Sequence, residues 1–133
     1  MLSKQIVFAM VMLLLPLLVQ ADAIDTLLEQ YRQQGAGNFS PDQGEMNWKQ
    51  SNQNSKSGKK RSCTDCHTSD LSMPGKHAKT GKKIDPMAPS VNFKRLTDSK
   101  KIEKWFKRNC HWTLGRTCTP QEKGDFLVYL RQQ

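Results

Sequence analysis

The chain has 133 residues, of which 36% are apolar and 25% charged, and its formal net charge is +9. This length suits one domain and is too short for two domains of ordinary size. The charge and a mean hydropathy of -0.70 exclude a protein with several membrane-spanning segments.

The long apolar run of the chain lies at its N-terminus, where residues 6–19 read IVFAMVMLLLPLLV and are followed by Gln-Ala-Asp-Ala. A lysine before the run, its short length and its small-x-small end are typical of a secretory signal peptide. The sequence therefore predicts a signal peptide over residues 1–23 that is cleaved after Ala23, export to the periplasm, and one mature domain over residues 24–133. The alternative is an uncleaved membrane anchor, which Pro16 and the short run disfavour.

Two helices are predicted at the start of the mature domain. Residues 24–35 have an amphipathic pattern that follows the cap candidates Asp25-Thr26. A second helix opens at Ser40-Pro41, with proline at the first helical position. On this helix Gly44 and Trp48 lie four residues apart, so a partner helix could approach closely at the glycine while the indole packs beside it.

Two later segments lack helical periodicity. Residues 51–62 are polar and are expected to form an exposed, mobile loop. Residues 67–98 contain three prolines and two glycines, and a segment this long without regular structure is uncommon unless it wraps a ligand or cofactor.

Two more helices are predicted near the C-terminus. Asp98 or Ser99 caps a helix that runs to about Asn109, and Thr119 to Glu122 form a capping box for the last helix. No repeat and no strand is evident, so the predicted fold is all-α. The apolar face of the first of these helices is Ile102, Trp105, Phe106 and Asn109, and that of the second is Phe126, Tyr129 and Leu130.

The most specific motif is Cys63-Thr64-Asp65-Cys66-His67, a C-x-x-C-H sequence. This spacing is typical of c-type haem attachment, in which two thiols bond to the vinyl groups of a haem and the histidine becomes the proximal iron ligand. The sequence therefore predicts one covalently attached haem c, bound by Cys63, Cys66 and His67. There are three other interpretations. A thioredoxin-like thiol pair would need a nearby strand and a zinc site would need a second closely spaced pair of ligands, and neither is evident. A structural disulfide would leave the histidine without a role.

The remaining two cysteines, Cys110 and Cys118, bracket seven residues. In an oxidising compartment two spare cysteines at this spacing are expected to form a disulfide. By the chain-entropy account such a bridge stabilises the fold by about 2–3 kcal/mol. Two free buried thiols are the alternative.

The residue opposite His67 decides whether the haem only carries electrons or also binds small molecules. Met73 and His77 follow His67 closely and reach poorly across a haem, whereas Met87 could reach and would give a permanent low-spin electron carrier. The other candidates are His111 and Asn109. Asn109 is a polar amide on the apolar face of its helix, where it needs a hydrogen bond or a metal. The alternative to a ligand role is a hydrogen bond from Asn109 to main-chain groups near the Cys110 loop. His111 lies about 200° around the helix from Asn109 and points away if the helix continues.

These residues resemble the sphaeroides haem protein family, a group of exported monohaem c-type cytochromes. The likeness lies in CTDCH and in PMAPSVNFKRLTDSKKIEKWFKRNC followed by WTLGRTCTPQEKGDFLVYL, within residues 86–130. In residues 24–62 it is limited to Gly44 and Trp48. The resemblance implies a small class I-like cytochrome c fold wrapped around one covalent haem.

The resemblance also implies that Asn109 is the second axial ligand of the oxidised iron, that it leaves on reduction, and that a diatomic ligand such as O2 or NO then binds. An amide is a weak ligand that suits ferric better than ferrous iron, which agrees with this behaviour. The disulfide implied is Cys110–Cys118, and the electron donors implied are a dihaem cytochrome c and a membrane cytochrome b. The chain differs from many members at His111, where they have asparagine, so His111 could be a distal hydrogen-bond donor or a rival ligand.

The charge is concentrated around the haem motif, because residues 56–108 hold 15 Lys and Arg against 5 Asp and Glu. This pattern predicts a basic surface that attracts an acidic redox partner, or else a solvated face that also balances haem propionates. A nucleic-acid partner is not expected for an exported protein, and an anionic membrane surface is an alternative.

Three functions follow from these observations. The first is a haem protein that binds a diatomic ligand on reduction, with O2 or NO reduction left open because only His77 and His111 offer acid–base groups. The second is an electron-transfer cytochrome with Met87 or His111 as a permanent sixth ligand. The third is a thiol oxidoreductase that uses Cys63 and Cys66 without haem.

Overall fold

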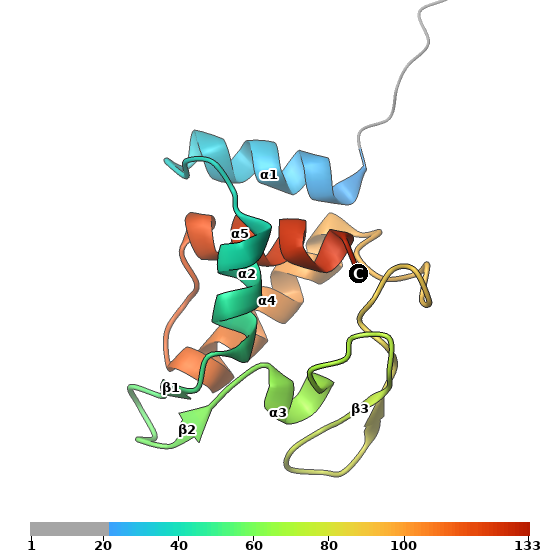
Figure 1. Cartoon of the computed structure of the whole chain (residues 1–133). Helices are drawn as coiled ribbons and strands as arrows, with labels where there is room; N and C mark the ends of the chain where they lie inside the picture. The colour runs from blue at the N-terminus through green and yellow to red at the C-terminus, as the bar shows by residue number, and fades with distance from the viewer. Residues whose placement is uncertain (1–21) are drawn as a thin grey trace, which may run out of the picture.

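The computed structural model describes residues 22–133, so the predicted signal peptide lies outside the described residues except for Asp22 and Ala23. None of the helices in this part of the chain combines the length and the apolar content that crossing a bilayer requires. The elements, in chain order, are α1 (Ala23–Gln33), α2 (Pro41–Lys49), β1 (Asn52–Gln53), β2 (Lys60–Arg61), α3 (Thr64–His67), β3 (Gly75–Lys76), β4 (Lys83–Ile84), α4 (Ser99–Leu114) and α5 (Pro120–Arg131), as Figure 1 shows.

The helix starts follow the capping signals of the sequence. Ser40 accepts a hydrogen bond from the main-chain N–H of Gln43, and Asp98 accepts one from Lys101. Thr119 and Glu122 form the predicted capping box, with proline at the first position of α5. For α1 the predicted cap at Asp25-Thr26 was wrong: the helix begins earlier, and Asp22 is the N-cap residue. Cleavage after Ala23 would therefore remove this cap.

The core forms where α2 packs against α5 and α1 lies across the same helix (Figure 1). Gly44 permits this close approach, because a Cβ atom at this position would lie 2.1 Å from the carbonyl oxygen of Asp125. Trp48, one turn further along α2, is buried against Phe126 and Tyr129. The roles predicted for Gly44 and Trp48 are thus both seen in the structure.

Helix α4 is longer than predicted. It continues past Asn109 to Leu114 and ends at Gly115, which has a φ of 76° and the left-handed conformation that favours glycine. The expected end near Asn109 was wrong because the disulfide cysteine that follows is accommodated within the helix. Consequently His111 does project away from the face that carries Asn109.

The structure also contains strands, which the sequence did not predict. β1 pairs with β2 and β3 with β4, each as a two-residue antiparallel pair. Residues 51–62, expected to be a mobile loop, form the hairpin around β1 and β2. Most of its side chains are exposed, but Asn54 is buried and bonds to the end of α4. These pairs escaped prediction because they are too short and too polar to show an alternating pattern.

Candidate functional site

A cavity of about 580 Å³ lies between α4 and the segment that contains the C-x-x-C-H motif. Its walls come from α2, from α3, from the segment between β3 and the start of α4, from α4 itself and from α5. Apolar side chains such as Leu96, Ile102, Phe106 and Leu130 form most of its surface, and polar and charged side chains form the smaller part. A concave, mostly apolar cavity of this size is typical of a cofactor site.

The motif itself is a single helical turn held rigidly at its start. The carboxylate of Asp65 accepts hydrogen bonds from the main-chain N–H and the hydroxyl of Ser62, both at 2.9 Å. The main-chain N–H of His67 donates to the carbonyl of Cys63 at 3.1 Å, which closes the turn. Cys63 and Cys66 are free thiols, and both line the cavity together with His67.

The environment of Cys63 argues against thiol redox chemistry. Burial, together with the smaller effect of the nearby charge of Asp65, raises the pKa of the Cys63 thiol to about 12. Redox-active thiols have lowered pKa values, because the thiolate is the reacting species. The burial of Cys63 and its raised pKa therefore disfavour the thiol oxidoreductase interpretation.

His67 has the protonation state of a metal ligand. Burial lowers its pKa to about 4, and the positive charge of Arg95 acts in the same direction. The imidazole is therefore neutral at physiological pH, which is the form that binds a metal. Its Nδ1 atom is buried and has no hydrogen-bond partner within residues 22–133.

The indole of Trp48 also points to a missing group. Its ring centroid lies 5.4 Å from that of His67, and its Nε1 is a second buried atom without a partner in the described chain. Buried polar groups are almost always hydrogen-bonded, so orphaned ones at a cavity indicate a bound group. The unpaired indole N–H, two thiols, a neutral imidazole and an apolar cavity fit the covalent haem that the motif predicts.

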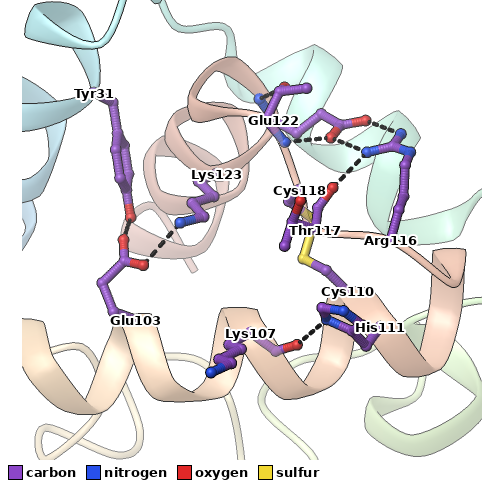
Figure 2. Close-up of a disulfide and its surroundings, with 11 residues drawn as sticks. Tyr31, Glu103, Lys107, Cys110, His111, Arg116, Thr117, Cys118, Glu122 and Lys123 are labelled. Atoms are coloured by element: carbon purple, nitrogen blue, oxygen red, sulfur yellow. Dashed lines mark hydrogen bonds and ion pairs between the residues drawn. A yellow bond between two sulfur atoms is a disulfide. The ribbon is translucent and has the colours of Figure 1, made fainter.

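Three of the five candidates for the sixth ligand line the cavity, namely His77, Met87 and Asn109. The other two do not. Met73 is exposed over 54% of its surface. His111 is exposed, and its Nδ1 lies 2.8 Å from the carbonyl oxygen of Lys107 on its own helix, as Figure 2 shows.

Asn109 belongs to the face of α4 that forms one wall of the cavity. The predicted face of Ile102, Trp105, Phe106 and Asn109 lines the cavity in full. Asn109 is exposed at this wall rather than buried, and its side-chain amide makes no hydrogen bond within residues 22–133, so the alternative hydrogen bond to main-chain groups near the Cys110 loop is not seen.

Met87 and His77 come from the segment between α3 and α4. Met87 packs against the hydrophobic core, and the next residue, Ala88, donates a main-chain hydrogen bond of 2.9 Å to Leu71, shortly after His67. Met87 therefore lies beside the segment that carries the proximal ligand candidate. His77 lies near the turn between β3 and β4, where its Nδ1 accepts two main-chain hydrogen bonds.

The structure contains the predicted disulfide between Cys110 and Cys118, whose Cα atoms are 5.6 Å apart (Figure 2). Within the loop that it closes, Arg116 donates hydrogen bonds of 2.8 and 2.7 Å to the two carboxylate oxygens of Glu122. Glu122 belongs to the capping box of α5. The disulfide and this ion pair together fasten the last turns of α4 to the start of α5, one residue after Asn109.

Two further features were not predicted from the sequence, one at the site and one in the core. Arg95 is partly buried at the cavity wall, where its guanidinium donates to the carbonyl oxygens of Pro86 and Asp85 at 2.9 and 2.6 Å. In the core, Tyr31 donates to Glu103, which also pairs with Lys123 at 2.8 Å (Figure 2). No sequence motif predicts either set of contacts, because each set forms only when segments that are distant in the sequence pack together.

A family described as a domain of unknown function, DUF1924, matches residues 34–130. The chain is 50% identical over 72 residues to cytochrome c-type protein SHP of Cereibacter sphaeroides, a match that covers 54% of this chain and 55% of that protein. The chain spans about half the length of the curated relatives it matches.

Solved structures extend this likeness to nearly the whole domain. Oxidised SHP, described as an oxygen-binding cytochrome c, is 34% identical with a TM-score of 0.74, over 86% of this chain and 100% of that one. The solution structure of cytochrome c'' from Methylophilus methylotrophus, reported for its haem-ligand detachment, is 34% identical with a TM-score of 0.71, over 83% and 93%. The prediction of a mostly helical, class I-like cytochrome c fold of this family is confirmed.

Proposed function

The chain belongs to the DUF1924 family and to the SHP-like c-type cytochromes, and on that premise we propose that it is an exported monohaem cytochrome c that binds a diatomic ligand when reduced. Cys63 and Cys66 would hold the haem covalently, and His67 would be its proximal ligand. The haem, when bound, supplies an iron that takes up an electron and accepts ligands on two faces. The proposed domain is residues 24–133, after a signal peptide over residues 1–23 and export to the periplasm.

We further propose that Asn109 is the sixth ligand in the oxidised state and withdraws on reduction, so that O2 or NO can enter the space beside it. The observation that carries this proposal is the position of Asn109 on the cavity wall formed by α4, a different element from the one that carries His67. A side-chain amide binds ferrous iron weakly, so it can leave without a large cost in free energy.

The names of the relatives support this proposal at a coarser level. Oxidised SHP is described as oxygen-binding, and cytochrome c'' is reported for haem-ligand detachment. The alternative is an electron-transfer cytochrome with a permanent sixth ligand, for which Met87 is the residue that lines the cavity. Its packing against the core, next to Ala88 that bonds to Leu71, favours a packing role for Met87 over a role as ligand.

Visible spectra of the haem-loaded protein distinguish these functions. For the native chain we expect a ferrous state that binds carbon monoxide at once, because the weak amide has left. Asn109→Ala is expected to convert the oxidised protein to a five-coordinate or water-bound spectrum, whereas Met87→Ala should leave that spectrum unchanged. A reversed result for the two variants, with a ferrous spectrum indifferent to carbon monoxide, would show a permanent Met87 ligand and an electron carrier.

The electron donors are the second part of the proposal. Within the described residues, none of the Lys and Arg side chains of residues 56–108 takes part in an ion pair. Several of them line the cavity, and these are Lys82, Lys83, Lys94, Arg95, Lys101 and Arg108. Unpaired positive charges around an opening attract an acidic partner, so we propose that an acidic donor such as a dihaem cytochrome c docks there, with a membrane cytochrome b upstream.

A charge reversal tests this docking. Lys82→Glu combined with Lys83→Glu is expected to slow reduction by an acidic dihaem cytochrome c at least about tenfold at low salt, and the difference should shrink as salt rises, because exposed charges are screened. Stopped-flow absorbance measures the rate. Lys49→Glu is the control, since Lys49 lies on α2 and does not line the cavity. Equal rates for both variants would place the docking surface elsewhere.

A further inference from the structure

The hairpin that leads into the haem motif is bonded to the end of α4. Asn54, which is only 3% exposed, donates from its side-chain amide to the carbonyl oxygens of His111 and Trp112 at 3.0 and 2.8 Å. Its side-chain oxygen accepts from the main-chain N–H groups of Lys56 and Ser57. This buried asparagine therefore joins the turn of the hairpin to carbonyl groups that a helix end leaves without partners.

Arg61 makes the second connection. Its Nη1 donates to the carbonyl oxygen of Trp112 at 2.7 Å, and its guanidinium carbon lies 4.4 Å from the centroid of the Trp112 ring. Arg61 thus contacts both the main chain and the indole ring of Trp112. In the described chain the carbonyl of Trp112 accepts from these two side chains and from no main-chain N–H, so its position depends on the hairpin.

The positions of these residues along the chain give the contact its significance. Arg61 stands two residues before Cys63, and Trp112 stands three residues after Asn109, on the same face of α4. Trp112 and Asn109 both line the cavity. The Arg61–Trp112 contact therefore joins the chain that leads into the first haem-binding cysteine to the helical turn that carries the proposed sixth ligand.

We infer that Arg61 is a positioning residue that sets how firmly Asn109 is held in the oxidised state. It acts through Trp112: the contact fixes the end of α4 relative to the motif, while the disulfide ties Cys110, the residue after Asn109, to Cys118 just before α5. Release of Asn109 then takes place by movement of its side chain against a fixed helix. This inference rests on the proposed function, because it requires Asn109 to be a ligand.

The test compares Arg61→Gln with Lys60→Gln in the haem-loaded protein. Lys60 is its exposed neighbour on β2, and the control removes the same charge without touching Trp112. Arg61→Gln is expected to raise the high-spin fraction of the oxidised protein and to speed hydrogen exchange of the amides of residues 110–114 about tenfold, because a charged hydrogen bond and a cation–π contact are lost. Arg61→Lys, which keeps a cation over the indole, should give intermediate values and guards against simple loss of folding.

Two results would overturn the inference. Faster exchange in Arg61→Gln with an oxidised spectrum like that of the native protein would show that Arg61 only stabilises the helix end. Equal high-spin fractions in Arg61→Gln and Lys60→Gln would show that the effect is one of charge. Failure of the proposed function is seen separately, because Asn109→Ala would then leave the oxidised spectrum unchanged.

Discussion

Replacing His67 with alanine is expected to remove the proximal ligand while the haem stays on the chain. The two thioether bonds to Cys63 and Cys66 do not depend on the imidazole, so the haem should remain bound through a denaturing gel. The spectrum of the native coordination should be lost in both oxidation states, and added imidazole should restore part of it by filling the space that the substitution creates. Visible absorbance and a haem stain measure these two properties independently.

The matched control is His77→Ala. His77 also lines the cavity, but its ring is engaged by main-chain N–H groups of its own turn. Its removal should leave the coordination spectrum unchanged. If instead His67→Ala kept the native spectrum and His77→Ala lost it, the proximal ligand would be His77, between β3 and β4. The role of the C-x-x-C-H histidine would then have to be abandoned.

The parts of the site that could be predicted are those encoded by neighbouring residues. Cys63, Cys66 and His67 are contiguous, so the chemistry of haem attachment is readable without any fold. The helix starts at Ser40 and Thr119 were predicted for the same reason, since a cap and its N–H donors lie within one turn. Periodicity likewise located the cavity face of α4, because three to four residues per turn bring a face together before any tertiary contact forms.

The parts that could not be predicted depend on packing between distant segments. Nothing in the sequence places Trp48 beside His67 or brings Arg61 onto Trp112, because these contacts exist only after α2, the hairpin and α4 have come together. The end of α4 was missed although Gly115 supplied a signal, because the nearby disulfide cysteines suggested a loop. The hairpin within residues 51–62 could not be predicted either, since composition does not show that Asn54 bonds to a helix end.

Replacing Gly44 with alanine is expected to lower the stability of the whole fold. A Cβ atom there would lie 2.1 Å from the carbonyl oxygen of Asp125 and 2.7 Å from the Cβ of Tyr129, which are a main-chain atom and the first side-chain atom of α5. Neither can turn aside, so α2 has to move away from α5. The better helix propensity of alanine offsets at most about 1 kcal/mol of this cost.

Overpacking of this kind costs about 1–3 kcal/mol, and a contact with main-chain atoms belongs at the upper end of that range. For a domain of this size we expect the midpoint of thermal unfolding to fall by about 10 °C or more. Circular dichroism of the haem-loaded protein measures it. Gly37→Ala is the control, because a Cβ atom at Gly37 would meet only the side chain of Gln121, at an ordinary 3.6 Å.

The same substitution links the core to the site, because α2 also carries Trp48. A shift of α2 away from α5 would move the indole that lies 5.4 Å from the ring of His67 and lines the cavity. Gly44→Ala should therefore change the haem spectrum as well as the stability, whereas Gly37→Ala should change neither. A destabilised variant with a native spectrum would show that the part of α2 that carries Trp48 stays in place, and that the close helix contact serves the core alone.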